Sequence, residues 1–368
     1  MDTSEAKHRS RPLRHERSDV LHFVTSRTIE ERFWLHPLLT AGAEPPNRKA
    51  KRVLKSIERL CDRRYARLAK QMNARAGKYS PRWTAEQVRR QCRSLVGDAL
   101  RRAQENNEVE VYAVIVMSNH IHLVIRTPGC NCASFLRDFK SLIAKSVNRF
   151  TERSGPLWAR RADVQPILDE EAAIERLVYT VDNPRKAKLV GDPEQWPGLN
   201  LCFGLSEVDE IPFEYFDAEE WHKRGRPHDL DPFFRIGKLK LSPLPVAEGT
   251  DRETYASDVR AWLAARVQEE QKQATNQGIQ ATRRDVLGVE AVIRAAFQHR
   301  PKNPSRSPRP YCFGNSANRR AQRALMSALI TAHEAASTAF LGGDRTVEFP
   351  AGTYPPPILS AATVGYHG

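Results

Sequence analysis

His120 and His122, separated by a single residue, form the pair of side chains in this sequence best placed for chemistry. They lie in an apolar stretch that predicts a β-strand, and on a strand residues i and i+2 point to the same face. Two neutral imidazoles side by side supply half of a divalent-metal site. Such a pair also occurs in ordinary protein cores, but two imidazoles in an apolar strand are hard to satisfy there. The setting therefore favours a metal site.

Tyr179 and Asn183 lie one helical turn apart at the end of a helix that we predict over 169–183. The apolar residues of this helix that repeat with helical periodicity predict its buried stripe: Ile174, Leu177, Val178 and Val181. Because Tyr179 lies outside this stripe, we expect an exposed phenol with the amide of Asn183 on the same face. This pair suits a nucleophile and a metal ligand, although an exposed tyrosine is also an ordinary surface residue.

The elements that must position these residues follow from the spacing of the apolar side chains. Short runs rich in β-branched residues predict strands at 22–25, 111–116 and 120–125. Helical periodicity, with a capping box that begins at Thr84, predicts further helices at 48–70, 84–103 and 133–150. Strands interleaved unevenly with helices favour an α+β fold with an antiparallel sheet over a regular βαβ series.

The composition changes along the chain and predicts its organisation. We expect five parts: a disordered basic tail at 1–18, a domain with the residues above at 19–200, an acidic and aromatic then proline-rich linker at 201–249, a helical extension at 250–345 and an extended tail at 346–368. The acidic and aromatic segment 207–221 has two interpretations. It is either a solvated surface segment or one that covers a basic face and competes with DNA.

The charge balance points to a polyanionic partner. Lys and Arg total 58 against 44 Asp and Glu, a net charge of +14, which favours nucleic acid, although a solvated basic surface has the same composition. No apolar run approaches the ~20 residues of a membrane helix, and the polar N-terminus argues against secretion. The six cysteines fit reduced thiols, because Cys130-x-Cys132 lacks the second pair of a structural zinc site.

Several motifs in this order resemble the HUH single-tyrosine transposases, and most closely their REP-associated tyrosine transposase branch. The resembling segments span most of residues 20–200: FVTSRTIEERFWL (23–35), VIVMSNHIHLVI (114–125), FLRDFKSLIAKSVNRF (135–150), GPLWARR (155–161) and LVYTVDNPRKAKLV (177–190). Ser118 departs from the family, where proline is usual. Residues 201–368 exceed the minimal transposase and are not explained by the resemblance.

The resemblance implies a fold, an activity and a site. The family fold is a ferredoxin-like antiparallel sheet flanked by helices, usually in a dimer. His120 and His122 would bind Mg²⁺ or Mn²⁺ with Asn183 as a third ligand, and Tyr179 would attack the DNA to give a 5′-phosphotyrosine and a free 3′-OH. The sequence does not identify the base for the phenol; Glu175, one turn earlier, is a candidate. The substrate would be single-stranded or hairpin DNA, met in the cytoplasm at the nucleoid.

Basic side chains are candidates for phosphate contacts, which supply affinity without reading sequence. We predict such contacts for Arg52, Lys55, Arg59, Arg137, Lys140, Lys145, Arg160 and Arg161. Trp158 would stack on a base or pack in the core. Two other hypotheses stay open: a catalytically silent regulator that binds hairpin or single-stranded DNA with the same fold, and a metal-dependent hydrolase without a covalent intermediate.

Overall fold

The computed structural model describes residues 16–40, 48–206, 208–276, 288–300 and 312–356. The predicted tail at 1–18 and the end of the chain therefore lie largely outside the described residues. The strands are β1 (Leu21–Arg27), β2 (Glu110–Met117), β3 (His120–Arg126), β4 (Asp163–Ile167), β5 (Asn200–Cys202), β6 (Glu210–Phe216) and β7 (Phe234–Lys240). The α-helices are α1 (Arg48–Arg75), α2 (Ala85–Asn107), α3 (Cys132–Thr151), α4 (Glu170–Val181), α5 (Asn183–Lys186), α6 (Ala218–Lys223), α7 (Arg252–Asn276), α8 (Val289–Arg294) and α9 (Ser316–Leu341).

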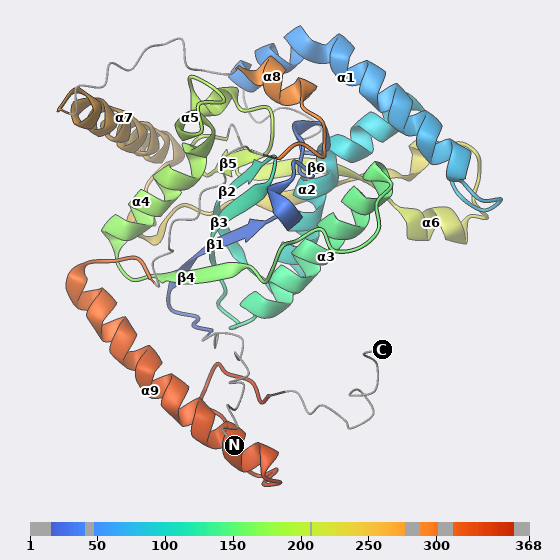
Figure 1. Ribbon diagram of the computed structural model, residues 1–368. Coiled ribbons are helices and arrows are strands. Elements are labelled where there is room, and N and C mark those ends of the chain that lie inside the picture. Colours follow the sequence, from blue (N-terminus) through green and yellow to red (C-terminus); the bar gives the residue numbers. More distant parts are fainter. Residues whose placement is uncertain (1–15, 41–47, 207, 277–287, 301–311, 357–368) are drawn as a thin grey trace, which may run out of the picture.

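A five-stranded antiparallel sheet forms the centre of the molecule, in the order β4-β1-β3-β2-β5 (Figure 1). The first four strands and the helices between them follow the ferredoxin-like pattern, and β5 extends the sheet beyond β2. The α+β fold with an antiparallel sheet and flanking helices, expected from the sequence, is confirmed. β4 is the edge strand beside β1, and no apolar run in the sequence predicted it.

The two faces of the sheet are covered by different helices. Ile121, Leu123 and Ile125 of β3 belong to the cluster that includes the apolar residues of α2 and α3, whereas Val124 packs with those of α4. Alternation along a strand then sends residues 120 and 122 to the face that α4 covers. The sequence pattern alone thus determines that the histidines share a face, and the packing of α4 determines which one.

The helix predicted over 169–183 is divided in two. α4 ends at Val181, Asp182 is its C-cap, and Asn183 begins the short helix α5 with Pro184 in the first turn. Proline lacks an N–H to donate, and its ring clashes with the carbonyl four residues earlier. The interruption therefore sits where the sequence puts a proline, and Asn183 belongs to α5 instead of ending α4.

The prediction of a linker at 201–249 is wrong for its central part. β6 and β7 form a hairpin that packs on α2, and Phe213 of β6 is 1% exposed within the main core. Arg90 of α2 pairs with Glu214 at 2.8 Å, and Ser94 Oγ accepts a hydrogen bond from the Glu214 amide. Residues 210–216 therefore form a strand that packs on α2, and residues 218–221 begin α6, so the segment is not simply a solvated surface stretch. Its competition with DNA stays a prediction.

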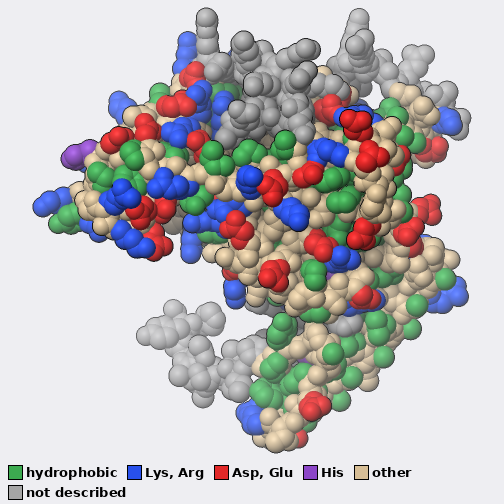
Figure 2. All heavy atoms as spheres, turned by 180° about the vertical axis from the view of Figure 1, so that it is seen from behind, with side chains coloured by type: hydrophobic (Ala, Val, Ile, Leu, Met, Phe, Trp, Pro, Cys, Tyr) green, Lys and Arg blue, Asp and Glu red, His purple; other side chains and the backbone are tan. Residues whose placement is uncertain are grey.

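The C-terminal region is mainly helical, as expected. α7 packs on α4, α8 packs on α1, and α9 extends away from the sheet (Figure 1). Side chains of α9 that are apolar and exposed include Leu325, Ile330 and Leu341, and apolar side chains follow the helix at the bottom of Figure 2. Within the described part of the chain, α9 alone is long and apolar enough to cross a membrane, by length and composition only. This finding qualifies the exclusion drawn from the sequence.

Candidate active site

The histidine pair faces α4 from the middle of the sheet. The ring centroids of His120 and His122 are 4.9 Å apart, and His122 is 5% exposed. Thr25 and Arg27 of β1 are the residues opposite His122 and His120. The two imidazoles therefore lie side by side, as the spacing of the residues predicts.

Tyr179 meets the pair from α4. Its ring centroid is 5.5 Å from that of His122. The ring of Phe23, on β1, stacks on His122 with 5.1 Å between the centroids. The same ring meets Tyr179 edge-on, with 5.8 Å between the centroids. The structure thus brings together His120, His122 and Tyr179. The expectation of an exposed phenol is wrong, because Tyr179 is half-buried against the sheet.

The tautomer of His120 follows from its neighbour Asn119. The Asn119 amide nitrogen donates to the Glu31 carbonyl at 3.1 Å, so the amide oxygen is the atom that faces His120 Nδ1, at 2.7 Å. A carbonyl oxygen can only accept, and Nδ1 must therefore carry the hydrogen. The lone pair of the neutral imidazole then lies on Nε2, which is the form that binds a metal.

His122 has an equivalent second contact. Its Nδ1 lies 2.9 Å from the hydroxyl oxygen of Thr25. A hydroxyl can donate or accept, so this contact orients the ring, and the lone pair of His122 lies on Nε2, as in His120, when Nδ1–H is the donor. Both imidazoles are thus oriented through Nδ1 by a neighbouring side chain, a frequent feature of histidines that ligate metals. The donor chemistry of the pair fits a divalent cation.

The third predicted ligand, Asn183, is 8% exposed at the start of α5. Its neighbour Asp182 accepts a hydrogen bond from Arg185 Nε at 2.6 Å, and Arg185 also contacts Glu270 of α7 at 2.8 Å. Burial raises the pKa of Asp182, although Arg185 opposes this. The junction of α4 and α5 is therefore braced by α7, while the contact of Asn183 with the histidines stays a prediction.

Clusters of three or more His, Cys, Asp or Glu that could hold a metal are absent from the described residues. A site at His120 and His122 would therefore need a ligand of another type, such as the amide of Asn183, or water. The six cysteines form no disulfides, and Cys132 is buried.

Two cations that the sequence reasoning missed flank the Tyr179 ring. The Arg176 guanidinium carbon is 4.8 Å from the ring centroid, and Lys186 Nζ is 5.3 Å from it. Glu175, the candidate base, is exposed and paired with Arg176. Helical spacing places Arg176, three residues before Tyr179, on the same face of the helix. It does not indicate that Arg176 is buried.

The predicted DNA contacts fall into three groups. The side chains of Arg52, Lys55 and Arg59 lie outside the described residues. Arg137 and Lys145 are exposed on α3, which covers the other face of the sheet.

Arg160 and Arg161 are exposed on the segment before β4. This segment is attached to β1 where Ala159 N donates to the carbonyl of Arg27, the residue opposite His120. Lys140 Nζ donates to the Arg160 carbonyl at 2.9 Å and lies over the ring of Trp158. The indole of Trp158 is half-buried and packs against the core. Of the predicted set, Arg160 and Arg161 are thus on the chain segment joined to the histidine end of β1.

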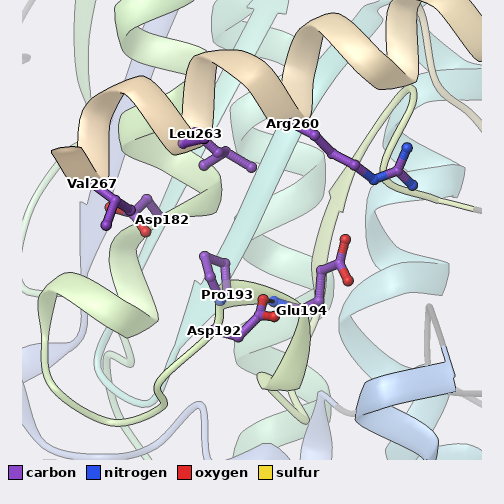
Figure 3. A pocket seen from close by; sticks show the side chains of 8 residues that line it. Asp182, Asp192, Pro193, Glu194, Arg260, Leu263 and Val267 are labelled. Atoms are coloured by element: carbon purple, nitrogen blue, oxygen red, sulfur yellow. Dashed lines mark hydrogen bonds between the residues drawn. The ribbon is translucent and has the colours of Figure 1, made fainter. Parts of the chain in front are cut away.

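A cavity of about 420 Å³ lies between α7 and the turn at 193–195 (Figure 3). Asp182, Asp192, Glu194 and Arg260 line it together with apolar side chains of α7. None of the predicted catalytic or metal-binding residues is among those that line it. The cavity is therefore separate from the histidine pair.

Comparison with known proteins finds one family model that matches part of this chain. Residues 77–172, about a quarter of the chain, match the Y1_Tnp family, described as IS200-like transposases. The matched segment contains His120 and His122 and ends before Tyr179 and Asn183. No curated protein matches the chain.

Two solved structures are similar at low levels. One is a REP-associated tyrosine transposase bound to a REP hairpin, with 15% identity, a TM-score of 0.31, and coverage of 51% of this chain and 81% of that chain. The other is an inferred transposase from Deinococcus radiodurans R1, with 15% identity, a TM-score of 0.22, and coverage of 45% and 89%. The strand order β4-β1-β3-β2-β5 of this chain is what defines its fold.

The match of residues 77–172 to the IS200-like transposase family confirms the expected resemblance to the single-tyrosine transposases at this level. The motif order of the chain is consistent with the REP-associated tyrosine transposase branch.

Proposed function

We propose that this protein cleaves and rejoins single-stranded DNA at hairpin-associated sites, in a metal-dependent reaction with Tyr179 as the nucleophile. The observation that carries the proposal is the meeting of Tyr179 with the histidine pair, with 5.5 Å between the ring centroids of Tyr179 and His122. A histidine pair on a central strand that faces a tyrosine on a packed helix is what the resemblance to HUH transposases implies.

Tyr179 Oη is the atom that attacks the scissile phosphate. The phenol gives up its proton to a base, and the new bond to phosphorus replaces the bond from phosphorus to the 3′ oxygen. The 5′ phosphate stays on the tyrosine, and the departing oxygen takes up a proton and becomes a 3′-OH. Lys186, whose ammonium group lies near the Tyr179 ring, is placed to offset the negative charge that builds at the phosphate. The same 3′-OH can reverse the step and rejoin the strand.

The residues present fit Mg²⁺ or Mn²⁺. His120 and His122 would hold the cation through Nε2, and Asn183 would hold it through the amide oxygen. When bound, the cation supplies Lewis-acid polarisation of the scissile phosphate. Asn119 and Thr25 keep the two imidazoles in the ligating orientation.

The remaining parts of the chain have proposed roles as well. Residues 19–200 form the transposase domain in this proposal, and Arg160 and Arg161 contact DNA phosphates near the site. The strand β6 and its hairpin partner join this domain structurally, although they follow it in the sequence. In this proposal the protein works on DNA in the cytoplasm, at the nucleoid, and a homodimer is what the resemblance implies.

Cleavage of labelled single-stranded DNA tests the proposal. Labelled hairpins from the sequences that flank the protein's own gene are incubated with the protein and Mg²⁺. The products are then analysed on a denaturing gel. Matched strands in which one hairpin arm is scrambled, and reactions with excess chelator, serve as controls. We expect cleavage beside the intact hairpin only, and only with the metal. Hairpin binding without cleavage under any of these conditions would favour the silent regulator instead.

A further inference from the structure

A short segment of the C-terminal extension, residues 312–318, is built into the edge of the catalytic domain. Phe313 forms a parallel bridge with Ile167 at the end of β4. Its amide donates to the Pro166 carbonyl, and its carbonyl accepts from the Leu168 amide, each at 2.9 Å. The segment thus adds one residue pair to the sheet on the outer side of β4, next to the start of α4.

The N-termini of α4 and α9 share one carboxylate. Asp169 is the N-cap of α4 and accepts from the Ala172 amide at 2.9 Å, and it also accepts from the Asn315 amide at 2.7 Å. Burial disfavours the charge of Asp169, but these hydrogen bonds and one from Asn318 hold its pKa below the ordinary value. Because Asn315 is itself the N-cap of α9, the two helices are fixed to each other at their first turns.

The side chain of Phe313 reaches the neighbourhood of the nucleophile. Its ring centroid is 4.3 Å from the Arg176 guanidinium carbon and 5.5 Å from the ring of Phe23, which stacks on His122. The guanidinium of Arg176 also lies over Tyr179 at 4.8 Å. Arg176 is therefore held between the ring of the extension and the ring of the nucleophile.

Contacts with aromatic rings largely hold the Arg176 side chain in place. Arg176 is 9% exposed, and its Nε has no hydrogen-bond partner among the residues that the structure describes. Its η2 nitrogen contacts Glu175. A guanidinium stacked on rings keeps its charge where ordinary hydrogen bonding is incomplete. If Phe313 is removed, the Arg176 side chain loses one of the walls that determine its position.

We propose that residues 312–318 are a positioning element of the catalytic site, in which Phe313 holds Arg176 and thereby keeps Tyr179 aligned with the histidines. This inference rests on the proposed function of Tyr179. It gives the C-terminal extension a part in the chemistry of the domain, although the extension lies beyond the minimal transposase. Phe313 and Arg176 act through Tyr179 and are positioning residues.

Single-turnover formation of the covalent DNA adduct, at increasing DNA concentration, separates positioning from binding. Phe313→Ala should lower the rate at saturating DNA by about tenfold to a hundredfold, the loss expected from a misplaced reacting group, and leave the half-saturating DNA concentration unchanged. Phe313→Tyr, which keeps the ring, should restore most of the rate. Phe313→Leu keeps the apolar packing without an aromatic face and should lie between the two, which covers the case in which the alanine variant fails to fold.

Phe349→Ala is the matched control. Phe349 is a half-buried phenylalanine of the same extension whose ring contacts are with His333 and Phe340. It should keep the wild-type rate. Arg176→Met should show the same loss as Phe313→Ala, and the double variant should be no slower than either, because both act through one contact.

The outcomes separate this inference from the proposed function. A wild-type protein that forms no adduct overturns the proposed function before any variant is compared. A wild-type adduct with equal rates for Phe313→Ala and Phe349→Ala overturns the positioning role alone. A Phe313→Ala variant that binds DNA more weakly but reacts at the wild-type rate at saturation also overturns it, because Phe313 would then be a DNA-binding residue.

Discussion

The packing of the β6–β7 hairpin on α2 gives a sharp prediction at Gly97. An alanine in the interior of a helix is normally more stable than glycine by about 1 kcal/mol. A Cβ at position 97, however, would lie 2.0 Å from one ring carbon of Phe213 and 2.3 Å from two others. Ordinary contact needs more than 3.4 Å, so the ring, which is 1% exposed, would have to move.

Overpacking of a core costs about 1–3 kcal/mol. After the gain in helix propensity, Gly97→Ala should lower the free energy of unfolding by up to about 2 kcal/mol. Phe213→Ala should by itself lower it by about 3–5 kcal/mol, because it leaves a cavity. In that background the space above residue 97 is open, and Gly97→Ala should become stabilising by about 1 kcal/mol. The sign of the Gly97 effect should thus reverse.

Urea unfolding of the four proteins of this double-mutant cycle measures the coupling. Tryptophan fluorescence reports on the unfolding of the hairpin, because the ring centroid of Trp83 lies 5.1 Å from that of Phe216 and 6.4 Å from that of Phe234. Stabilisation by Gly97→Ala in the otherwise wild-type chain would refute the placement of the hairpin. That is the result expected if residues 201–249 were a solvated linker.

Three further predictions concern the histidines. His120→Ala or His122→Ala should abolish DNA cleavage on a denaturing gel while filter binding of DNA is largely kept, because basic residues elsewhere contact the phosphates. Asn119→Ala should weaken Mn²⁺ binding in calorimetry by about 10–100-fold, whereas Asn119→Asp, which keeps the acceptor, should retain most of it; equal affinities would contradict the second contact of His120. Burial, with a contribution from Arg64, lowers the pKa of His36 to about 3, so the unfolded chain takes up a proton between pH 6.5 and 3 that the folded chain does not. The free energy of unfolding should fall by up to about 1.4 kcal/mol per pH unit as the pH drops through this window, and urea titrations of His36→Asn should show a weaker dependence.

Local patterns were sufficient for the three central strands of the sheet and for the histidine pair. Alternation along 120–125 predicts two imidazoles on one face, and apolar runs predict the strands on either side. The nucleophile was harder to describe. Tyr179 lies outside the apolar stripe of its helix, yet it is half-buried, because Phe23 and the histidines face it from the sheet. A stripe predicts one buried face, whereas α4 packs on the sheet and also on α7.

The hairpin and the cage around Arg176 show two other limits. Ile211, Phe213 and Tyr215 recur at alternate positions, which is a strand signal, but the many acidic residues on either side of them suggested a solvated segment. The meeting of Arg176 with Phe313 depends on two segments that are distant in the sequence. No periodicity in either segment carries that information, because only the folded chain brings them together.

The state of Tyr179 after reaction with hairpin DNA tests the central claim most directly. Wild-type protein and Tyr179→Phe are incubated with labelled single-stranded DNA and Mg²⁺, and the products are separated in SDS. Loss of one hydroxyl from a half-buried ring should cost little stability, so both proteins should melt alike and bind DNA alike. We predict an SDS-resistant adduct on the 5′ side of the cut for the wild type, a free 3′-OH that a polymerase extends, and no adduct for Tyr179→Phe. An adduct on Tyr179→Phe, or a stable wild-type protein that binds hairpins and never forms one, would contradict the account.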